Sequence, residues 1–258
     1  MVSKQWYRFL LVGFLSLLFS VLGSWAQPAY AGLVTIDGPT GSGNFGKATV
    51  LSNGNIVVVD SSYDIPNGPA NVGAVYLYDG ATQTLISRLT GSTADDQVGN
   101  GGVTALTNGN YVVTSYNWRN DSAIDAGAVT WGNGTTGITG TVSAANSLVG
   151  GKADDRVGSD GDTALSNGNY VVLNSNWGNG SANAVGAVTW GNGTTGITGT
   201  VSAANSLVGS TENDKVGSNG VTALSNGNYV VRSLFWSNNG KIEAGAVTRG
   251  GAVLAARD

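Results

Sequence analysis

The chain has 258 residues, is rich in glycine with 41, and contains neither histidine nor cysteine. It therefore cannot form disulfides, a Ser-His-Asp or Cys-His catalytic group, or the usual zinc and copper sites. The formal net charge is −4 and no basic cluster stands out, so we expect no nucleic-acid partner.

Residues 1–31 are typical of a cleavable secretion signal. Lys4 and Arg8 supply a positive start, the apolar stretch Phe9–Gly23 follows, and the segment ends in Ala-Tyr-Ala, the small residues that a signal peptidase reads. The apolar stretch is too short to favour a stable transmembrane helix, with an uncleaved anchor as the alternative. We predict that the mature domain, 32–258, is secreted, extracellular or on the cell surface, with the periplasm as an alternative, and that it does not insert into a membrane.

Three short motifs recur in register along the mature chain. Successive copies of Asn-Gly-Asn are separated by 55, 59 and 59 residues, and apolar-Gly and Gly-Ala-Val motifs keep nearly the same spacing. Residues 127–150 and 186–209 are identical, which indicates a recent internal duplication. Such periodicity is the signature of a repeat protein. We predict one β domain, 32–258, with four repeats at about 38–95, 96–154, 155–213 and 214–258.

The second repeat can be divided into strands from its sequence. Val103–Leu106 and Tyr111–Ser115 flank an Asn-Gly pair, which predicts a hairpin with a type I′ turn, since both central residues of that turn need a positive φ. Gly127–Trp131 is predicted as a third strand and Val142–Val149 as a fourth. Four short antiparallel strands make up one blade of a β-propeller.

The predicted fold class is all-β, a repeat protein that forms a small β-propeller of four blades. The fourth repeat lacks the usual last strand, and the N-terminal strand Leu33–Ile36 would complete that blade and hide the sheet edges. An incomplete propeller, clipped from a longer array, is one alternative. The other is a β-solenoid, which the Asn-Gly turns disfavour because solenoid strands pair in parallel.

The order of the motifs, from apolar-Gly through strand-Asn-Gly-strand to Gly-Ala-Val, resembles the FG-GAP repeat of integrin-type β-propellers. It is also similar to uncharacterised tandem repeats of bacterial filamentous-haemagglutinin-like surface proteins. The resemblance covers about 40–258 and implies a propeller fold. The chain departs from it in two places: the Gly-Ala-Pro step after the second strand is absent, and Thr107–Asn110 replaces the acidic calcium loop. We therefore predict no cofactor and do not carry calcium over to that loop.

Three acidic residues recur just before the apolar-Gly pair of the later repeats: Asp96, Asp155 and Asp214. We interpret them as turn-forming residues whose carboxylates accept local backbone hydrogen bonds. One alternative is a glycosidase pair, which needs two carboxylates in different environments. The other is calcium binding, for which oxygen ligands are present but the alternating acidic loop is not. The calcium candidates are Asp95 with Asp96, Asp154 with Asp155, and Asp160 with Asp162.

Aromatic residues occupy one repeat position in the loop after the second strand. They are Tyr63, Trp118, Trp177 and Trp236, and amides flank three of them. A ring of aromatics and amides on one face suits sugar binding, since aromatic faces offer apolar area and amides hydrogen-bond hydroxyls. We name these four as candidate ligand-binding residues. The alternative is that each ring packs in the core between adjacent repeats.

Together these observations predict a secreted or cell-surface binding or scaffold propeller that contacts a glycan or a protein and is not an enzyme. Two alternatives remain: a carbohydrate-active enzyme that uses carboxylates, and a truncated remnant of a larger surface adhesin. Two carboxylates converging in one asymmetric pocket would favour the enzyme, whereas an open array would favour the remnant.

Overall fold

The structure, a computed structural model, describes residues 34–238 and 240–251. The chain divides into two compact units, Met1–Ile36 and Asp37–Asp258, and every described strand belongs to the second. The predicted secretion signal lies outside the described residues. Within the described ranges the chain forms strands and turns, and no helix there is long and apolar enough to cross a membrane.

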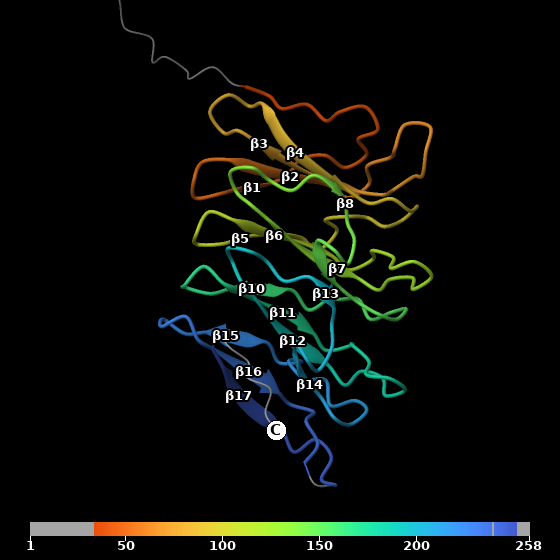
Figure 1. Ribbon diagram of the computed structural model, residues 1–258, viewed down its shortest axis with the longest axis vertical. Coiled ribbons are helices and arrows are strands. Elements are labelled where there is room, and N and C mark those ends of the chain that lie inside the picture. Colours follow the sequence, from red (N-terminus) through yellow and green to blue (C-terminus); the bar gives the residue numbers. More distant parts are fainter. Residues whose placement is uncertain (1–33, 239, 252–258) are drawn as a thin grey trace, which may run out of the picture. The chain divides into compact units, whose positions relative to one another are not determined.

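Four sheets follow one another in chain order, one for each repeat (Figure 1). The prediction of an all-β repeat protein is therefore confirmed. The first sheet contains β1 (Lys47–Val50), β2 (Ile56–Asp60), β3 (Ala74–Tyr78) and β4 (Leu85–Thr90). The second contains β5 (Gly102–Ala105), β6 (Tyr111–Ser115), β7 (Ala128–Gly132) and β9 (Ser147–Val149). The third contains β10 (Asp162–Ala164), β11 (Tyr170–Asn174), β12 (Ala187–Gly191) and β14 (Leu207–Val208), and the fourth β15 (Val221–Ala223), β16 (Tyr229–Ser233) and β17 (Ala246–Gly250).

Strands within each repeat pair antiparallel, as predicted, and the Asn-Gly-Asn motif closes a hairpin. In the second repeat Ala105 lies opposite Tyr111, and the backbone N–H of Gly109 donates to the carbonyl of Leu106 at 3.1 Å. Gly109 has φ 87°, but Asn108 does not have a positive φ. The predicted type I′ turn is therefore wrong, because that turn needs two left-handed residues; the connection fits a turn closed by one left-handed glycine.

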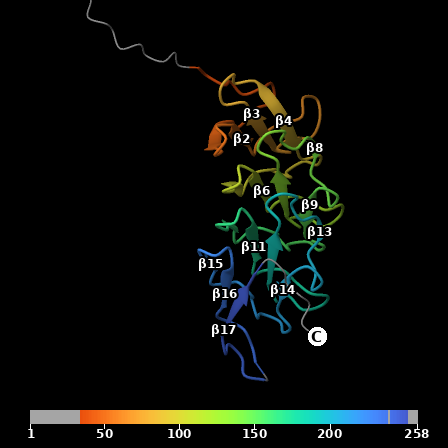
Figure 2. The ribbon, with the colours of Figure 1, turned by 60° about the vertical axis from the view of Figure 1, so that its left-hand side comes forward.

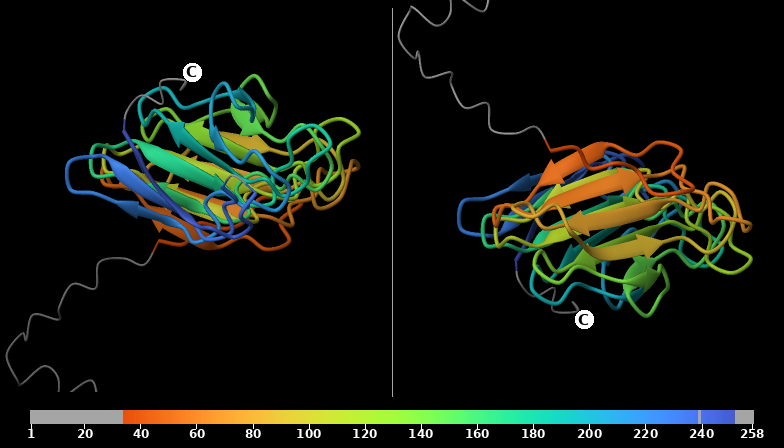
Figure 3. Two further views of the ribbon diagram at one scale, coloured as in Figure 1. Left: turned by 90° about the horizontal axis from the view of Figure 1, so that it is seen from below. Right: turned by 90° about the horizontal axis from the view of Figure 1, so that it is seen from above.

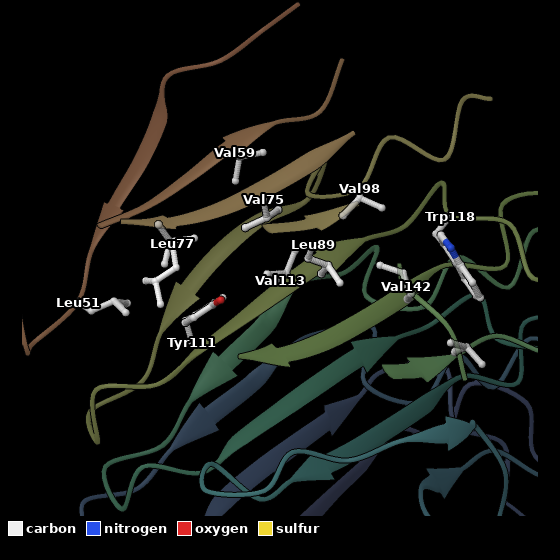
Figure 4. Close-up of a cluster of buried hydrophobic side chains, with 13 residues drawn as sticks. Leu51, Val59, Val75, Leu77, Leu89, Val98, Tyr111, Val113, Trp118 and Val142 are labelled. Atoms are coloured by element: carbon white, nitrogen blue, oxygen red, sulfur yellow. The ribbon is translucent and has the colours of Figure 1, made fainter. Parts of the chain in front are cut away.

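Neighbouring sheets pack face to face and enclose a hydrophobic core between them (Figure 4). On β6, Tyr111 and Val113 belong to the core shared with the first sheet, whereas Val112 belongs to the core shared with the third. Both faces of this strand are thus covered, and all five of its residues are buried. Figure 2 shows the same succession of sheets from another direction, and Figure 3 shows the sheets lying over one another when seen from below and from above. Burial on both faces explains why the second strands read as continuous apolar runs instead of alternating.

Two short strands connect successive repeats in a way that the sequence did not predict. β8 (Gly140–Thr141) pairs in parallel with β4 of the preceding repeat, and β13 (Gly199–Thr200) pairs in parallel with β9. β4 and β9 are therefore hydrogen-bonded on both sides, antiparallel to their own sheet and parallel to the next repeat. The fold combines the antiparallel hairpins expected of a blade with the parallel pairing between repeats that the solenoid alternative anticipated.

The predicted closure of the first and fourth sheets is not seen in the described residues. Leu33 lies outside them, and residues 34–36 form no strand. The segment that follows is used by the first sheet: the backbone N–H of Asn44 donates to the Asp60 carboxylate at 2.8 Å, and the Phe45 ring lies edge-on to Tyr76 at 5.6 Å between centroids. Since Val75 faces the second sheet, Tyr76 points to the opposite face. The N-terminal segment covers that face and does not complete the fourth sheet.

The described part of the fourth repeat leaves the far face of its sheet uncovered. Val247 is 75% exposed, whereas Val129 and Val188, at the same position of the second and third repeats, are fully buried. In those repeats the glycine that begins the next repeat lies over the valine: a Cβ on Gly217 would come within 2.6 Å of Val188 Cγ2. Each sheet thus depends on the next repeat to bury one of its faces.

Candidate functional site

Trp118, Trp177 and Trp236 pack in or against the cores between successive sheets, whereas Tyr63 packs on Tyr76, on the face of the first sheet turned away from the second. Tyr63, Trp118 and Trp177 are only 4%, 5% and 5% exposed, and Trp236 is half-buried. Trp118 packs in the same cluster as Val142 (Figure 4). The structure does not bring the four rings together on one surface. Because stacking on a sugar needs an exposed ring face, this placement favours the packing alternative.

The tyrosine of the first repeat has a different environment from the three tryptophans. The Tyr63 ring is edge-on to Tyr76 at 6.4 Å between centroids, and the Arg88 guanidinium lies 5.7 Å from its centroid. The amides that flank the tryptophans differ as well. Asn117 donates to the Gln97 side chain at 2.7 Å, Asn176 is exposed, and the backbone N–H of Asn238 donates to the carbonyl of Lys241.

The recurring aspartates each fasten two loops where successive repeats meet. The buried Asp155 carboxylate accepts the backbone N–H groups of Gly151 and Lys152, both at 2.9 Å, and that of Gly178 at 3.2 Å. Asp96 and Asp214 accept the equivalent groups at their own boundaries. Burial raises the pKa of Asp96 and Asp155, and the N–H donors offset part of the rise. These contacts agree with the turn-forming interpretation.

The other acidic candidates do not gather into a cluster. Asp95 and Asp154 are exposed, and Asp154 lies 3.6 Å from the Arg156 guanidinium. Asp160 accepts the backbone N–H of Ser175, whereas Asp162 accepts the Thr114 hydroxyl of the preceding repeat at 3.0 Å. In the described ranges, no group of three or more acidic side chains could hold a metal ion.

The Asn-Gly-Asn motif has a second role that sequence reasoning missed, which is to bind the next repeat. Asn108 and Asn110 both donate side-chain N–H groups to the carbonyl of Gly193, at 2.7 and 2.8 Å, and the Trp131 indole donates to the same oxygen at 3.0 Å. In the first repeat Asn53 and Asn55 bind the carbonyl of Gly134. The recurrence of Gly-Asn-Gly after the third strand was the available signal.

Two adjoining hollows open at the boundary between the second and third repeats, with volumes of about 220 and 260 Å³. They share Lys152, Asp155 and Gly178 as lining residues. The smaller hollow reaches the edge of Trp177, and the larger one reaches Asn176. Of the four candidate aromatics, Trp177 therefore lies beside a space that a small ligand could enter. Further lining residues are Asn179, Val201 and Ser202 in the smaller hollow and Asp154 and Asn183 in the larger.

Residues that break the repeat pattern surround these hollows. Lys152 and Gly178 stand where the boundary between the first and second repeats has Thr93 and Arg119. The Lys152 ammonium donates to the carbonyl of Gly180 at 2.6 Å, and a Cβ on Gly178 would come within 2.8 Å of Lys152 Nζ. Glycine at 178 therefore leaves room for the lysine.

The cation beside the recurring aspartate comes from opposite loops at the two boundaries. Lys152 lowers the pKa of Asp155, and Arg119 lowers the pKa of Asp96, while burial raises the pKa of both carboxyl groups. At the boundary between the second and third repeats, glycines at 178 and 180 stand where the preceding boundary has the larger Arg119 and Asp121. A search for differences between the repeats would have found this site, whereas a search for common residues could not.

No match was found among the curated proteins. A family model matches the chain four times, at residues 50–100, 105–159, 164–218 and 223–253. These matches confirm four tandem repeats, and they do not confirm the resemblance to FG-GAP repeats. Each matched segment begins at the last residue of the first strand of a sheet and contains the remaining strands of that sheet. The chain therefore belongs to the family described as a repeat of unknown function, DUF5650.

Proposed function

We propose that the protein is an exported, non-catalytic binding protein that contacts a glycan through the loops that line the two hollows between its second and third repeats. The sequence of residues 1–31 supports export. The absence of histidine and cysteine from the chain supports a role without catalysis. The proposal does not require a closed FG-GAP-type propeller, because an open stack of sheets is also a firm support for loops.

One observation carries the proposal: among the described boundaries between repeats, only that between the second and third has Lys152 and two glycines, where the boundary between the first and second has Thr93, Arg119 and Asp121. The neighbouring segments 127–150 and 186–209 are identical, so the two repeats are otherwise closely similar there. Residues common to all repeats build the stack, whereas function is carried by sites added to a fold. The hollows at this break in the pattern offer amides, a cation and an apolar edge, the groups that fix a small polar ligand.

The recurring carboxylates support binding over hydrolysis. Asp155 accepts three backbone N–H groups, and the equivalent Asp96 and Asp214 accept backbone N–H groups at the corresponding positions. A glycosidase pair needs one carboxyl group as an acid and one as a nucleophile or base, in environments that differ. Three equivalent carboxylates occupied by backbone groups fit a structural role better.

The test is to apply the purified mature protein, from residue 32, to immobilised glycans and immobilised proteins, with a heat-unfolded sample as the control. We expect the folded protein alone to retain glycans, with no released sugar detected by chromatography. Retention on proteins without any glycan binding would contradict the proposal. Release of sugar fragments would instead support the enzyme.

A further inference from the structure

We propose that the two hollows at the boundary between the second and third repeats are neighbouring subsites for consecutive units of a neutral oligosaccharide, with Lys152 between them. This inference rests on the proposed function and names the ligand class of the same site. It is carried by the arrangement of the hollows, by their charge, and by the substitutions that distinguish this boundary from the one between the first and second repeats.

The size and position of the hollows suit a chain of small units. Volumes of about 220 and 260 Å³ are each below the roughly 300 Å³ at which pockets for drug-sized ligands begin. Each hollow is therefore suited to one compact ring. Because both are lined by Lys152, Asp155 and Gly178, they adjoin, and a ligand that fills both must be linked across these three residues.

The charges of the site favour a neutral ligand. Lys152 is the one cation that lines the hollows, and Asp154 and Asp155 are the carboxylates. Asp155 already accepts three backbone N–H groups, so Asp154 is the carboxylate that is open to a ligand. An anionic ligand would face these carboxylates, and a cationic one would face the lysine. Hydroxyl groups can donate to carboxylate oxygens and accept from ammonium and amide groups, so a polyol satisfies both kinds of partner.

Lys152 is held in place for this role by the protein itself. Its ammonium group donates one N–H to the carbonyl of Gly180 at 2.6 Å, which leaves two donors of the three for a ligand. Gly178 keeps the space above it open, because any side chain there would meet the ammonium group. Trp177 and Val201, 5% and 4% exposed, add an apolar wall and not a stacking platform. Lys152 is therefore the specificity-determining group.

The boundary between the first and second repeats provides a matched design for closing the site. The triple variant Lys152→Thr/Gly178→Arg/Gly180→Asp gives the hollows the residues that stand at the equivalent positions of that boundary. It keeps a cation beside the buried aspartate, as Arg119 does for Asp96, so the fold is preserved. Asp121 and Gly180 both have a left-handed φ, 51° and 59°, so aspartate is accommodated at 180.

The experiment is isothermal titration of the mature protein with cellobiose, maltose and N,N′-diacetylchitobiose, with their monosaccharides, and with a disaccharide containing glucuronic acid. We expect a neutral disaccharide to bind at one site per chain, and about tenfold more tightly than its monosaccharide because it fills both hollows. Lys152→Thr should weaken it by about tenfold, and the triple variant should abolish binding while the unfolding midpoint stays the same. Thr93→Lys, at the boundary between the first and second repeats, is the control and should change nothing.

The outcomes separate this inference from the proposed function. If the unmodified protein binds glycans on the array but the triple variant binds them equally well, the subsite assignment is wrong and the binding function stands. Tighter binding of the glucuronic acid disaccharide would overturn the neutral class. If the folded protein retains no glycan at all, the proposed function itself falls. Conversely, Thr93→Lys/Arg119→Gly/Asp121→Gly should add a second site per chain.

Discussion

Asp162 on β10 occupies the position at which the second and fourth repeats carry Val103 and Val221. Its Oδ2 atom is buried and has no hydrogen-bond partner among the described residues, while Oδ1 accepts the Thr114 hydroxyl. Burial raises the pKa of this carboxyl group, and hydroxyl groups, including that of Thr114, oppose the rise. The neighbouring titratable group is the Tyr170 phenol, whose own pKa is raised by burial.

Replacement of this aspartate by the valine of the other repeats is expected to stabilise the protein at neutral pH. A carboxyl group whose folded pKa lies above its unfolded value stabilises at low pH, and that stability is lost as the pH rises through the folded pKa. Asp162→Val should therefore raise the free energy of unfolding by about 1 to 3 kcal/mol at pH 7 and by less at pH 4. Urea unfolding at both pH values measures this, and an equal gain at both would contradict the assignment.

Asp96 offers a prediction of the opposite sign. Asp96→Ala would leave the backbone N–H groups of Ser92, Thr93 and Arg119 without their carboxylate acceptor, at a cost of roughly 2 to 4 kcal/mol. The matched control is Asp95→Asn, next in the chain but exposed; asparagine tolerates its left-handed φ of 65°. The control should change the free energy of unfolding by less than about 0.5 kcal/mol in the same denaturation assay. Equal losses would show that the three hydrogen bonds are not what stabilises the turn.

At the scale of single residues, the sequence predicted where side chains lie along the chain better than it predicted whether they are exposed. It placed Trp118 and Trp177 correctly in the loop after the second strand, but the same pattern suits a ring that faces solvent and a ring that packs against a neighbouring sheet. Which is true depends on whether a neighbouring repeat covers the loop. The role of Gly178 was invisible for another reason, since a glycine in a glycine-rich loop carries no signal by itself.

At the scale of the elements, the amide contacts between turns give a test of how the repeats adhere. Asn108→Ala removes the hydrogen bond to Gly193 of the next repeat and should cost about 1 kcal/mol. Asn226 is the equivalent residue of the fourth repeat, and its described side-chain contact is local, to the N–H of Asn228 at 3.1 Å. Asn226→Ala should therefore cost clearly less. Thermal unfolding of the two variants measures the difference, and a larger loss for Asn226→Ala would contradict the adhesive role.

The hairpins were predictable because an Asn-Gly pair between two apolar runs is a strong local signal. The turn type was not, since Asn108 does not take the left-handed conformation that the prediction assumed. β8 and β13 were missed because strands of two residues show no periodicity. These strands form only by pairing with β4 and β9 of the preceding repeat: Thr141 lies opposite Thr90, and Thr200 lies opposite Val149.

At the scale of the whole molecule, stability should behave as a sum of neighbouring contacts, as in other repeat proteins. Val188 and Val247 occupy the same repeat position, but Val188 is fully buried beneath the fourth repeat and Val247 is 75% exposed. Val188→Ala should cost about 2 kcal/mol in denaturant unfolding, from lost burial and the cavity left behind. Val247→Ala should stay within about 0.5 kcal/mol. Equal effects would mean that Val247 is covered in solution.

The number and order of the repeats followed from the sequence, but their closure did not. Whether successive sheets return to the first depends on the rotation between neighbours, which no motif encodes. The segment that follows the predicted closing strand contacts the first sheet, because Asp60 and Tyr76 provide partners for Asn44 and Phe45. The hollows escaped prediction because they arise where one repeat differs from the next.

The strands that are bonded on both sides have a mechanical consequence. β4 and β9 each hold their own sheet and the following repeat, so a force that pulls successive repeats apart must break parallel hydrogen bonds as well as separate the cores. Between the third and fourth repeats no such pair is found in the described residues, where β14 bonds only to β12. Under tension the fourth repeat should therefore detach first. The force would then act on the third repeat, whose loops line part of the hollows.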